Sequence, residues 1–429
     1  MSKIKKLIRT PGIFFADMAI KRGYGKTVAF SHNTSQVINP KEESASSKPP
    51  VKKIPQKNTA TTETLNTDAI NFFMPASVLL HTGEGEASGS AHLSMWIPYF
   101  SGSGCQFTIL VRNIGLYSWV RKNYPLIPVA YAKNPIDVET VINRLPSLQA
   151  CFYPSNTGNN IHLLRFNHIE HVFIGHGDSD KSASAHKFFR VYDKIWVAGQ
   201  AHIDRFNNSS FCTRHLEFIK IGRPNLKDIL LRSENPWHER SSFISILYLP
   251  TWEGVFEEQN YSSTKISGEI IRKVKENFKV EVNVKFHPMT GNRDKTLVNI
   301  REDLGKALVQ IGLPINIEQR LTPIHELLKK TNVFICDISA VVSECLSADG
   351  PIFVFIPQDR EIKLSQSDMP YDYYSYTFSS PSELIEKMGR VLAGDDYLSD
   401  KRREAIDYLI GRSQTLESEF SRQLSLYKQ

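Results

Sequence analysis

The sequence lacks an apolar run long enough to cross a membrane. A transmembrane helix needs about 18 to 20 consecutive apolar residues, and no stretch of the 429 residues reaches that length. A secretory signal peptide is not expected either, because no continuous apolar core follows the basic N-terminus. These absences argue against an integral membrane protein and against a chain carrying a cleaved secretory leader.

Cysteine is scarce, and its spacing fits neither a metal site nor a disulfide framework. The five cysteines are Cys105, Cys151, Cys212, Cys336 and Cys345. Cys151 and Cys336 belong to apolar runs and are expected to be small core residues. This usage fits a reducing compartment. No acidic cluster requires a metal, so we expect none.

Net positive charge is absent from the body of the chain and concentrated in its first residues. Of the net charge of +7, residues 1–26 contribute +6 and residues 31–66 contribute +2, which leaves −1 for the remainder. A protein that binds nucleic acid through its fold needs a basic surface on that fold. The charge distribution therefore predicts no nucleic-acid partner.

The first 30 residues have the pattern of a helix that lies in a membrane interface. Ile4, Leu7 and Ile8 share one helical face, Thr10-Pro11 is typical of a helix start, and Lys and Arg flank the apolar stripe. We expect peripheral binding to an anionic membrane, on its cytoplasmic face; the alternative is a helix packed on the body. Residues 31–66 are rich in Ser, Thr, Lys and Pro and predict a flexible linker.

The remaining chain is long enough for two domains and alternates strand and helix patterns. The predicted strands are Phe107–Val111, Ile127–Tyr131, Ala150–Tyr153, His171–Ile174, Lys194–Val197, Glu217–Ile221, Phe243–Tyr248, Glu281–Phe286, Asn332–Cys336 and Ile352–Phe355. The predicted helices include Thr264–Asn277, Asp294–Gly312, Pro323–Lys330 and Asp400–Tyr427.

This alternation predicts right-handed βαβ units and parallel sheets. The fold class is therefore α/β, with two facing Rossmann-like domains at residues 67–232 and 240–395, joined by a polar hinge at 233–242. We expect the last segment, 396–429, to form a helix that packs back on the body.

Short motifs with chemically active side chains follow the apolar strands. They are His176-Gly177-Asp178-Ser179-Asp180-Lys181, Leu249-Pro250-Thr251-Trp252, Lys285-Phe286-His287-Pro288 and Asp337-Ile338-Ser339-Ala340. Open α/β sheets bind ligands at the carboxyl ends of their strands. Histidines, lysines and hydroxyls at these ends predict a cleft that handles phosphate.

The first motif offers a base and a cation. His176 follows a strand and a glycine, and imidazole is the side chain best suited to accept a proton near neutral pH. Lys181 is suited to hold a phosphate as a point charge. The alternative is that His176 serves only as a turn or packing residue.

The second half offers matching groups. His287, held extended by Pro288, is placed to donate to phosphate oxygens beside Lys285, although His-Pro is also an ordinary strand ending. Pro250 and Thr251 are expected to shape a base- or ribose-binding edge. Trp252 is expected to form a wall or a domain interface.

A strand, a turn and a helix around Asp337 and Ser339 predict an anion site at a helix start, with Glu344 one turn on within reach of ribose hydroxyls. Alternatively, Asp337 or Ser339 only caps the helix. Arg223, after a glycine, is placed to lie over a diphosphate. His202, Asp204 and Arg205 begin another helix. A solvated helix start is the favoured interpretation, and contact with an acceptor is the alternative.

Together these motifs resemble the CDP-glycerol glycerophosphotransferase family of teichoic-acid and capsule polymer enzymes, over roughly residues 100–390. The family elements are matched by His176, Gly177 and Lys181; by Tyr248, Pro250, Thr251 and Trp252; by Lys285, His287 and Pro288; and by Asp337 and Ser339. The resemblance implies a GT-B-type fold and an enzyme that moves glycerol phosphate from CDP-glycerol to a hydroxyl of a lipid-linked saccharide or polyol-phosphate acceptor.

Under that resemblance His176 and His287 are the catalytic histidines, and no cofactor is implied beyond the CDP-activated donor. The chain departs from the family pattern at Ile338, Ala340 and Glu344, and after Gly222-Arg223-Pro224-Asn225. These departures lie in the donor elements and leave the donor's identity open. The alternatives are a GT-B glycosyltransferase that uses a nucleotide sugar and a non-catalytic membrane-tethered assembly subunit.

Overall fold

The computed structural model describes residues 75–428, apart from positions 178, 182–183, 233–235, 240–242, 321, 366 and 412–413. The predicted membrane segment and linker of residues 1–66 lie outside the described residues, as does most of the predicted hinge. The proposed domain boundaries stay a prediction. No helix in the described ranges is both long enough and apolar enough to span a bilayer.

The first half is built on a seven-stranded parallel sheet with the strand order β3-β2-β1-β4-β5-β6-β7. Its strands are β1 (Val78–Thr82), β2 (Phe107–Val111), β3 (Val129–Tyr131), β4 (Ala150–Tyr153), β5 (Glu170–Phe173), β6 (Lys194–Val197) and β7 (Glu217–Lys220). Strands β1, β2 and β4 are buried along their whole length. This is expected for parallel strands that are covered on both faces.

Helices cover both faces of this sheet. They are α4 (Glu86–Gly102), α5 (Ile114–Asn123), α6 (Pro135–Asn143), α7 (Ile161–Leu164) and α8 (Gln200–Asn207), with short 3₁₀ turns η1 (Gly158–Asn160) and η3 (Lys187–Val191). The segments that follow, η4 (Pro224–Leu226), α9 (Lys227–Arg232) and η5 (Trp237–Glu239), place Leu226, Ile229 and Trp237 in cores of the second half. One hydrophobic core holds side chains of α4 and α5, and another holds those of α6, α7 and α8. Local sequence sets the helix starts: Asn134 accepts from the N–H groups of Ile136 and Asp137, and Pro135 follows it.

The second half has a six-stranded parallel sheet with the order β10-β9-β8-β11-β12-β13. Its strands are β8 (Ser245–Leu249), β9 (Glu281–Val284), β10 (Asn316–Ile317), β11 (Val333–Asp337), β12 (Ile352–Phe355) and β13 (Tyr376–Phe378). The central strands β8, β11 and β12 are fully buried.

The second sheet is also covered on both faces. Its helices are α10 (Ser267–Asn277), α11 (Ile300–Gln310), α12 (Ile324–Leu328), α13 (Val341–Leu346), α14 (Tyr371–Tyr374) and α15 (Pro381–Leu392), with 3₁₀ turns η6 (Glu257–Gln259), η7 (Thr264–Ile266) and η8 (Lys295–Leu297). Side chains of α10, α11 and α15 share one core, and those of α12, α13 and α14 share the other.

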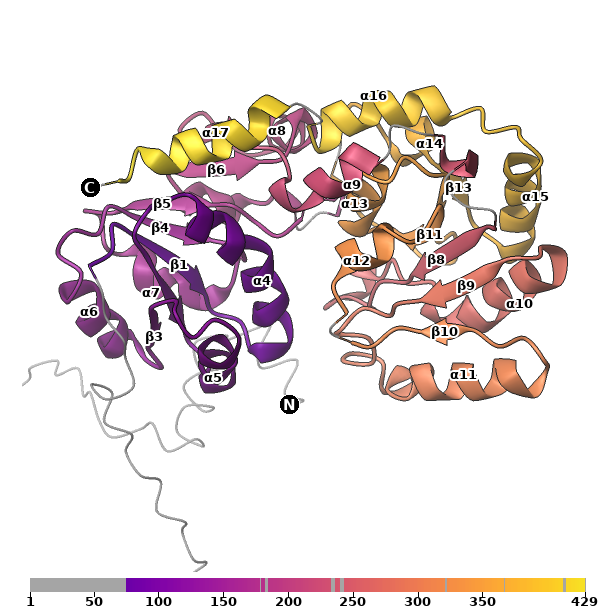
Figure 1. The fold of residues 1–429 in the computed structure, drawn as a ribbon, viewed down its shortest axis with the longest axis horizontal. Coiled ribbons are helices and arrows are strands. Elements are labelled where there is room, and N and C mark those ends of the chain that lie inside the picture. Colours follow the sequence, from indigo (N-terminus) through magenta and orange to yellow (C-terminus); the bar gives the residue numbers. More distant parts are fainter. Residues whose placement is uncertain are drawn as a thin grey trace, which may run out of the picture. The chain divides into compact units, whose positions relative to one another are not determined.

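The last two helices, α16 (Ser399–Leu409) and α17 (Gln414–Ser425), belong to different halves. Figure 1 shows both in yellow, α16 beside α14 and α17 beside β6. Ala405, Ile406 and Leu409 of α16 enter a core of the second half, whereas Phe420 and Leu424 of α17 enter a core of the first. The end of the chain therefore packs on both sheets.

The prediction of two parallel-sheet α/β halves is confirmed. Every strand that was predicted is present, with ends that differ by at most two residues. Strand β1 was missed, as were the short strands β10 and β13. The predicted helix at 294–312 is divided into η8 and α11, and the predicted helix at 400–427 is divided into α16 and α17.

Each sheet has a topological switch point, where the strand order reverses and ligands bind in open α/β folds. In the first sheet it lies between β1 and β4, and in the second between β8 and β11. The residues that follow these four strands therefore define where the site is expected.

Candidate active site

His176 follows β5 on a tight turn. Gly175 adopts φ 62°, a conformation that glycine allows without a steric penalty. The Nε1 atom of Trp96 on α4 donates to the Gly175 carbonyl at 2.7 Å and fixes the turn. His176 Nδ1 lies 2.8 Å from the Pro154 carbonyl oxygen, which only accepts hydrogen bonds. Nδ1 therefore carries the proton, and Nε2 is the nitrogen that can accept one.

Burial keeps His176 uncharged. Its pKa is lowered to about 3. Burial is the largest cause, His92 and Arg223 also lower the pKa, and Glu84 raises it. The ring is consequently neutral at physiological pH and can take a proton. An anionic ligand beside it would raise this pKa.

Gly177 brings the His176 turn against the second half. A Cβ atom at position 177 would lie 2.8 Å from Ala340 Cβ and 3.7 Å from Glu344 Oε1. Residues 340 and 344 belong to the turn and helix α13 that follow β11. Because Gly177 has no side chain, the turn that carries His176 can approach that helix.

Lys181 reaches from the first half into the second. Its Nζ donates to Thr251 Oγ1 at 3.0 Å and lies 5.3 Å from the centre of the Tyr261 ring. Burial lowers the pKa of Lys181 to about 8, while the Asp337 carboxylate opposes that shift. The Lys181 side chain therefore reaches the switch point of the second sheet, at the loop that follows β8.

The loop that carries Lys181 is held by a buried ion pair. Arg205 Nε donates to Asp180 Oδ1 at 2.7 Å, and His202 Nε2 donates to the Ser184 carbonyl at 2.9 Å. His202 and Arg205 are buried, so the interpretation of this segment as a solvated helix start is wrong. Asp180 and Ser184 both lie on the loop between His176 and η3, and the sequence alone did not reveal these two contacts.

Asp337 holds the loop after β8 through hydrogen bonds to the backbone of that loop. Its Oδ2 accepts from the N–H groups of Thr251 at 2.7 Å and Ser263 at 2.9 Å. Burial raises the pKa of Asp337 to about 6, against the effect of these hydrogen bonds and of Lys181. The side chain is fully buried, so its visible role is to hold Thr251, while direct contact with a donor stays a prediction.

His287 has the opposite tautomer from His176. Its Nδ1 accepts from the Met289 N–H at 3.1 Å, so Nε2 carries the proton and is a donor. The ring stacks on Trp252 with a centroid distance of 6.1 Å, which gives the tryptophan a wall position. Burial lowers the pKa of His287 to about 3, and the charge of Lys181 adds to the effect.

Lys285 lies on the same segment, but its Nζ already donates to the carbonyl oxygens of Gln319 at 3.4 Å and Arg320 at 3.1 Å. Burial lowers its pKa to about 8, as does the nearby Arg301. A phosphate contact by Lys285 stays a prediction.

The helix start after β11 differs from the expected cap. Ser339 Oγ donates to the Asp337 carbonyl at 3.2 Å, and the N-cap position of α13 belongs to Ala340, which makes no side-chain cap. The interpretation of Asp337 or Ser339 as a helix cap is therefore wrong. Ser339 and Glu344 are both largely buried close to Gly177, and their donor contacts stay predictions.

The remaining predicted residues lie at the expected strand ends. Pro250 is buried directly after β8. Arg223 precedes η4, after Gly222 with φ 68°, and lies close enough to His176 for its charge to lower that pKa. This places Arg223 near His176.

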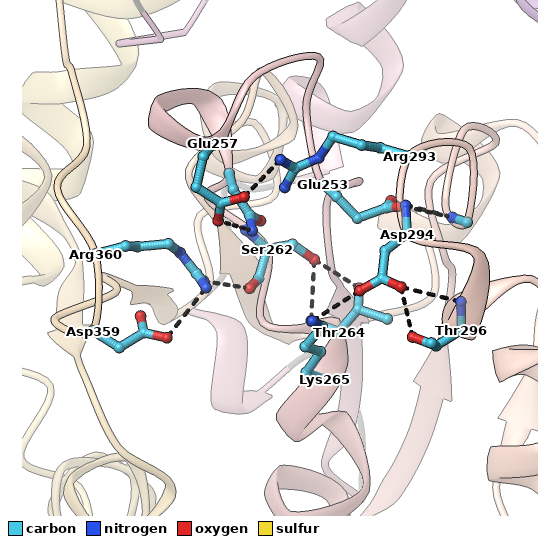
Figure 2. Close-up of polar contacts among 12 residues, drawn as sticks. Glu253, Glu257, Ser262, Thr264, Lys265, Arg293, Asp294, Thr296, Asp359 and Arg360 are labelled. Carbon is cyan, nitrogen blue, oxygen red and sulfur yellow. Dashed lines mark hydrogen bonds and ion pairs between the residues drawn. The ribbon is translucent and has the colours of Figure 1, made fainter. Parts of the chain in front are cut away.

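A polar frame fixes the loops after β8, β9 and β12 (Figure 2). The buried Glu253 carboxylate accepts from the Gly291 N–H at 3.0 Å and the Asp294 N–H at 2.9 Å. Arg360 donates to the Ser262 carbonyl at 2.8 Å, and Arg293 pairs with Glu257 at 2.6 Å. These contacts join three loops at the carboxyl edge of the second sheet.

Two residues near His176 were missed from the sequence. His92 of α4 stacks on His176, and Glu84 lies 2.7 Å from His92 Nδ1. Val78–Thr82 followed by Gly83-Glu84-Gly85 is a strand running into a glycine-rich turn and a helix, which is the signal that was available. In the described part of the chain, no group of three His, Cys, Asp or Glu side chains could hold a metal ion.

Comparison with solved structures identifies the fold class. The wall teichoic acid polymerase TagF matches with a TM-score of 0.52 at 12% identity, covering 82% of this chain and 88% of that one. A histidine-to-asparagine TagF variant soaked with CDPG matches with a TM-score of 0.51 at 12% identity, over 81% of this chain and 89% of that one. S. aureus MnaA with UDP matches with a TM-score of 0.54 at 11% identity, over 82% and 95%. The fold is of the GT-B type.

The family follows from the sequence. Residues 173–411 match the model of the CDP-Glycerol:Poly(glycerophosphate) glycerophosphotransferase family, which is more than half of the chain. The chain belongs to this family and is an enzyme of its transferase class. No curated relative matches the sequence.

Proposed function

We propose that this enzyme transfers glycerol phosphate, or a related alditol phosphate, from CDP-glycerol to a hydroxyl of a membrane- or lipid-linked acceptor. Such a reaction extends a teichoic-acid-like or capsule polymer. Family membership supports the donor class, and the TagF variant soaked with CDPG has the same fold. The proposed reaction needs a base, phosphate-binding cations and hydrogen-bond donors from the enzyme.

The opposite tautomers of the two histidines are the observation that carries this proposal. Hydrogen bonds to Pro154 and from Met289 leave His176 Nε2 as an acceptor and His287 Nε2–H as a donor. His287 is close enough to the first half for His176 and Lys181 to lower its pKa. Transfer to a hydroxyl requires a base that takes the hydroxyl proton and a hydrogen-bond donor to the phosphate oxygens.

The proposed step is an in-line displacement. His176 Nε2 takes the acceptor hydroxyl proton while that oxygen attacks the β-phosphorus of CDP-glycerol. The bond between the β-phosphorus and the bridging oxygen breaks, and CMP leaves with the electron pair. His287 Nε2–H, Lys181 and Arg223 offset the charge on the phosphate oxygens. Phosphoryl transfer depends mainly on such positioning and charge neutralisation.

The donor is proposed to occupy the carboxyl edge of the second sheet. Thr251 and Pro250 after β8, and Ser339 and Glu344 after β11, flank the switch point there. In this arrangement the diphosphate lies near His287 and Lys181, with Lys285 and Asp337 at its margin. The acceptor hydroxyl enters from the side of His176.

The basic first 26 residues support a peripheral location on the cytoplasmic face of the membrane. Their net charge of +6 is suited to an anionic lipid surface, where a lipid-linked acceptor is presented. This location is proposed from the sequence pattern and from the acceptor chemistry.

The test is a donor screen with the purified full chain. The protein is incubated with a panel of CDP- and UDP-activated donors and a hydroxyl acceptor, and nucleotide release and product mass are measured. CMP release with transfer of a phosphorus-containing group supports the proposal. UDP or CDP release with transfer of a sugar lacking phosphorus would assign the chain to glycosyl transfer instead.

A further inference from the structure

The proposed base has a partner ring that no family motif in the sequence includes. His92 of α4 and His176 stack face to face, with centroids 3.6 Å apart and ring planes at 9°. His92 Nδ1 lies 2.7 Å from Glu84 Oε2, and the two side chains are only 17% and 15% exposed. Glu84 lies directly after β1, at the switch point of the first sheet.

Glu84 is itself held in place. Thr82 Oγ1 donates to Glu84 Oε2 at 3.0 Å, and Ser155 Oγ, after β4, lies 3.0 Å from Thr82 Oγ1. The polar groups after β1 and β4 thus form one chain that ends at the His92 ring. Such a chain fixes the carboxylate beside His92.

We propose that Glu84 and His92 are positioning residues for His176: the carboxylate fixes the His92 ring, and the stacked ring fixes the plane and the charge environment of His176. The inference rests on the proposed function of His176 as the base. It adds two residues to the reaction that act through His176 and that do not touch the reacting atoms.

Geometry explains how the pair acts. The Pro154 carbonyl holds only the Nδ1 edge of His176, and one hydrogen bond leaves a ring free to rotate about it. The parallel His92 ring removes that rotation and directs Nε2 along one line. Proximity effects in catalysis depend on such alignment, and a misplacement of 1 Å can cost about a hundredfold in rate.

Charge gives the pair a second effect. When His176 takes a proton, the nearby Glu84 carboxylate stabilises the imidazolium, whereas His92 and Arg223 oppose it. From the second half, His287 interacts with His176, and Glu344 approaches the adjacent Gly177. Glu84 is the anion that acts on His176 from within the first half, so removing its charge weakens the base.

A purely structural role is the competing explanation, and α4 supplies a matched control for it. Trp96, one turn beyond His92, already joins α4 to the His176 turn through the Gly175 carbonyl. Trp96→Phe removes that hydrogen bond while it leaves the rings of His92 and His176 stacked. It measures the cost of loosening α4 against the turn without changing the proposed pair.

The experiment compares Glu84→Gln, His92→Phe, His92→Ala and Trp96→Phe in the full chain. We expect His92→Ala to lower kcat by roughly tenfold to a hundredfold with the donor KM within about twofold. His92→Phe, which keeps a stacked ring, should recover part of that loss. Glu84→Gln should lower kcat more than Trp96→Phe does at equal thermal stability.

A second readout does not depend on the donor. Nitrogen NMR of labelled histidine rings at neutral pH reports which nitrogen of His176 carries the proton, with the signal assigned by its loss in His176→Asn. The wild type and His92→Phe should show a single Nδ1–H tautomer. His92→Ala should show a mixture, because a ring without its stacking partner can turn away from the Pro154 carbonyl that fixes the tautomer. A single tautomer together with unchanged kcat in His92→Ala would overturn the inference. If the wild type transfers nothing from any CDP donor, the proposed function fails, and the tautomer still decides whether the pair fixes the ring.

Discussion

Lys181 of the first half donates from Nζ to Thr251 Oγ1 of the second half at 3.0 Å, above the buried Asp337 carboxylate. The lysine therefore joins the His176 loop to the switch point of the other sheet. Because burial lowers the pKa of Lys181 to about 8, its charge is lost within the range where the protein can be studied.

Donor binding should take up a proton at pH 9. Free Lys181 is mostly neutral above its pKa of about 8, and a bound diphosphate favours the charged form, so the pKa rises on binding. Calorimetry with CDP in two buffers of different ionisation enthalpy measures the uptake. Lys181→Met should remove it. Lys285→Met should keep most of the uptake, because Lys285, whose pKa is also lowered to about 8, already donates to the Gln319 and Arg320 carbonyls at the margin of the proposed site. Undiminished uptake in Lys181→Met would show that this lysine does not meet the phosphates.

His287→Ala and Ser339→Ala should weaken CDP binding more than they alter the fold. Both are proposed phosphate contacts, and losing a hydrogen bond to a charged group costs roughly 1.5–3 kcal/mol. Titration with CDP measures the affinity, and thermal unfolding controls for stability. Ser339 Oγ also donates to the Asp337 carbonyl, so its variant is expected to lose slightly more stability. Unchanged affinity in both variants would mean that the donor lies elsewhere.

The sequence predicted the strands that His176 and His287 follow, but not the tautomers of the two rings. An apolar run followed by Gly175-His176 or by Phe286-His287-Pro288 is sufficient to place a histidine at a strand end. The tautomers depend on the Pro154 carbonyl and the Met289 N–H, which are backbone groups with no sequence signature. Which nitrogen acts was therefore beyond prediction.

Contacts between distant segments account for the rest. Arg205 and Asp180 are 25 positions apart, so their ion pair is invisible to a reading of helix patterns. Strand β1 was missed because it ends in His81-Thr82, two polar residues that tertiary structure buries, with His81 Nδ1 donating to the Leu110 carbonyl. Missing β1 also meant missing Glu84 and the helix that carries His92.

Asp180→Asn should destabilise the protein strongly. The Asp180 and Arg205 side chains are 6% and 1% exposed, and removing one charge of a buried pair leaves the other without compensation, at a cost of about 3–5 kcal/mol. Denaturant unfolding measures the change. A double variant, Asp180→Leu with Arg205→Met, should recover part of the stability while transfer stays low, because the Lys181 loop loses its anchor. A stable and active Asp180→Asn protein would contradict this role of the ion pair.

Deletion of residues 1–26 should release the protein from anionic vesicles. The segment carries a net charge of +6, and each Lys or Arg near an anionic surface contributes about 1 kcal/mol. Transfer to a short water-soluble acceptor should survive, while transfer to a lipid-linked acceptor in vesicles should fall. Binding of the full chain should weaken as salt rises.

Vesicle co-sedimentation and thermal unfolding together decide between the interpretations of this segment. A truncated protein that sediments with vesicles as well as the full chain does would remove the membrane role. A truncated protein that unfolds would instead indicate that Leu7, Ile8, Phe14 and Phe15 pack on the body.

The most direct test of the account follows the phosphorus from donor to product in the wild type and in His176→Ala. Purified full chain is supplied with CDP-glycerol labelled at the β-phosphorus and with a hydroxyl acceptor, and CMP and product are measured. The account predicts that the label enters the acceptor with one CMP released per transfer, and that His176→Ala loses about 10²–10⁴-fold in rate while CDP binding persists. Wild-type turnover in His176→Ala, or label that stays with the released nucleotide, would contradict it.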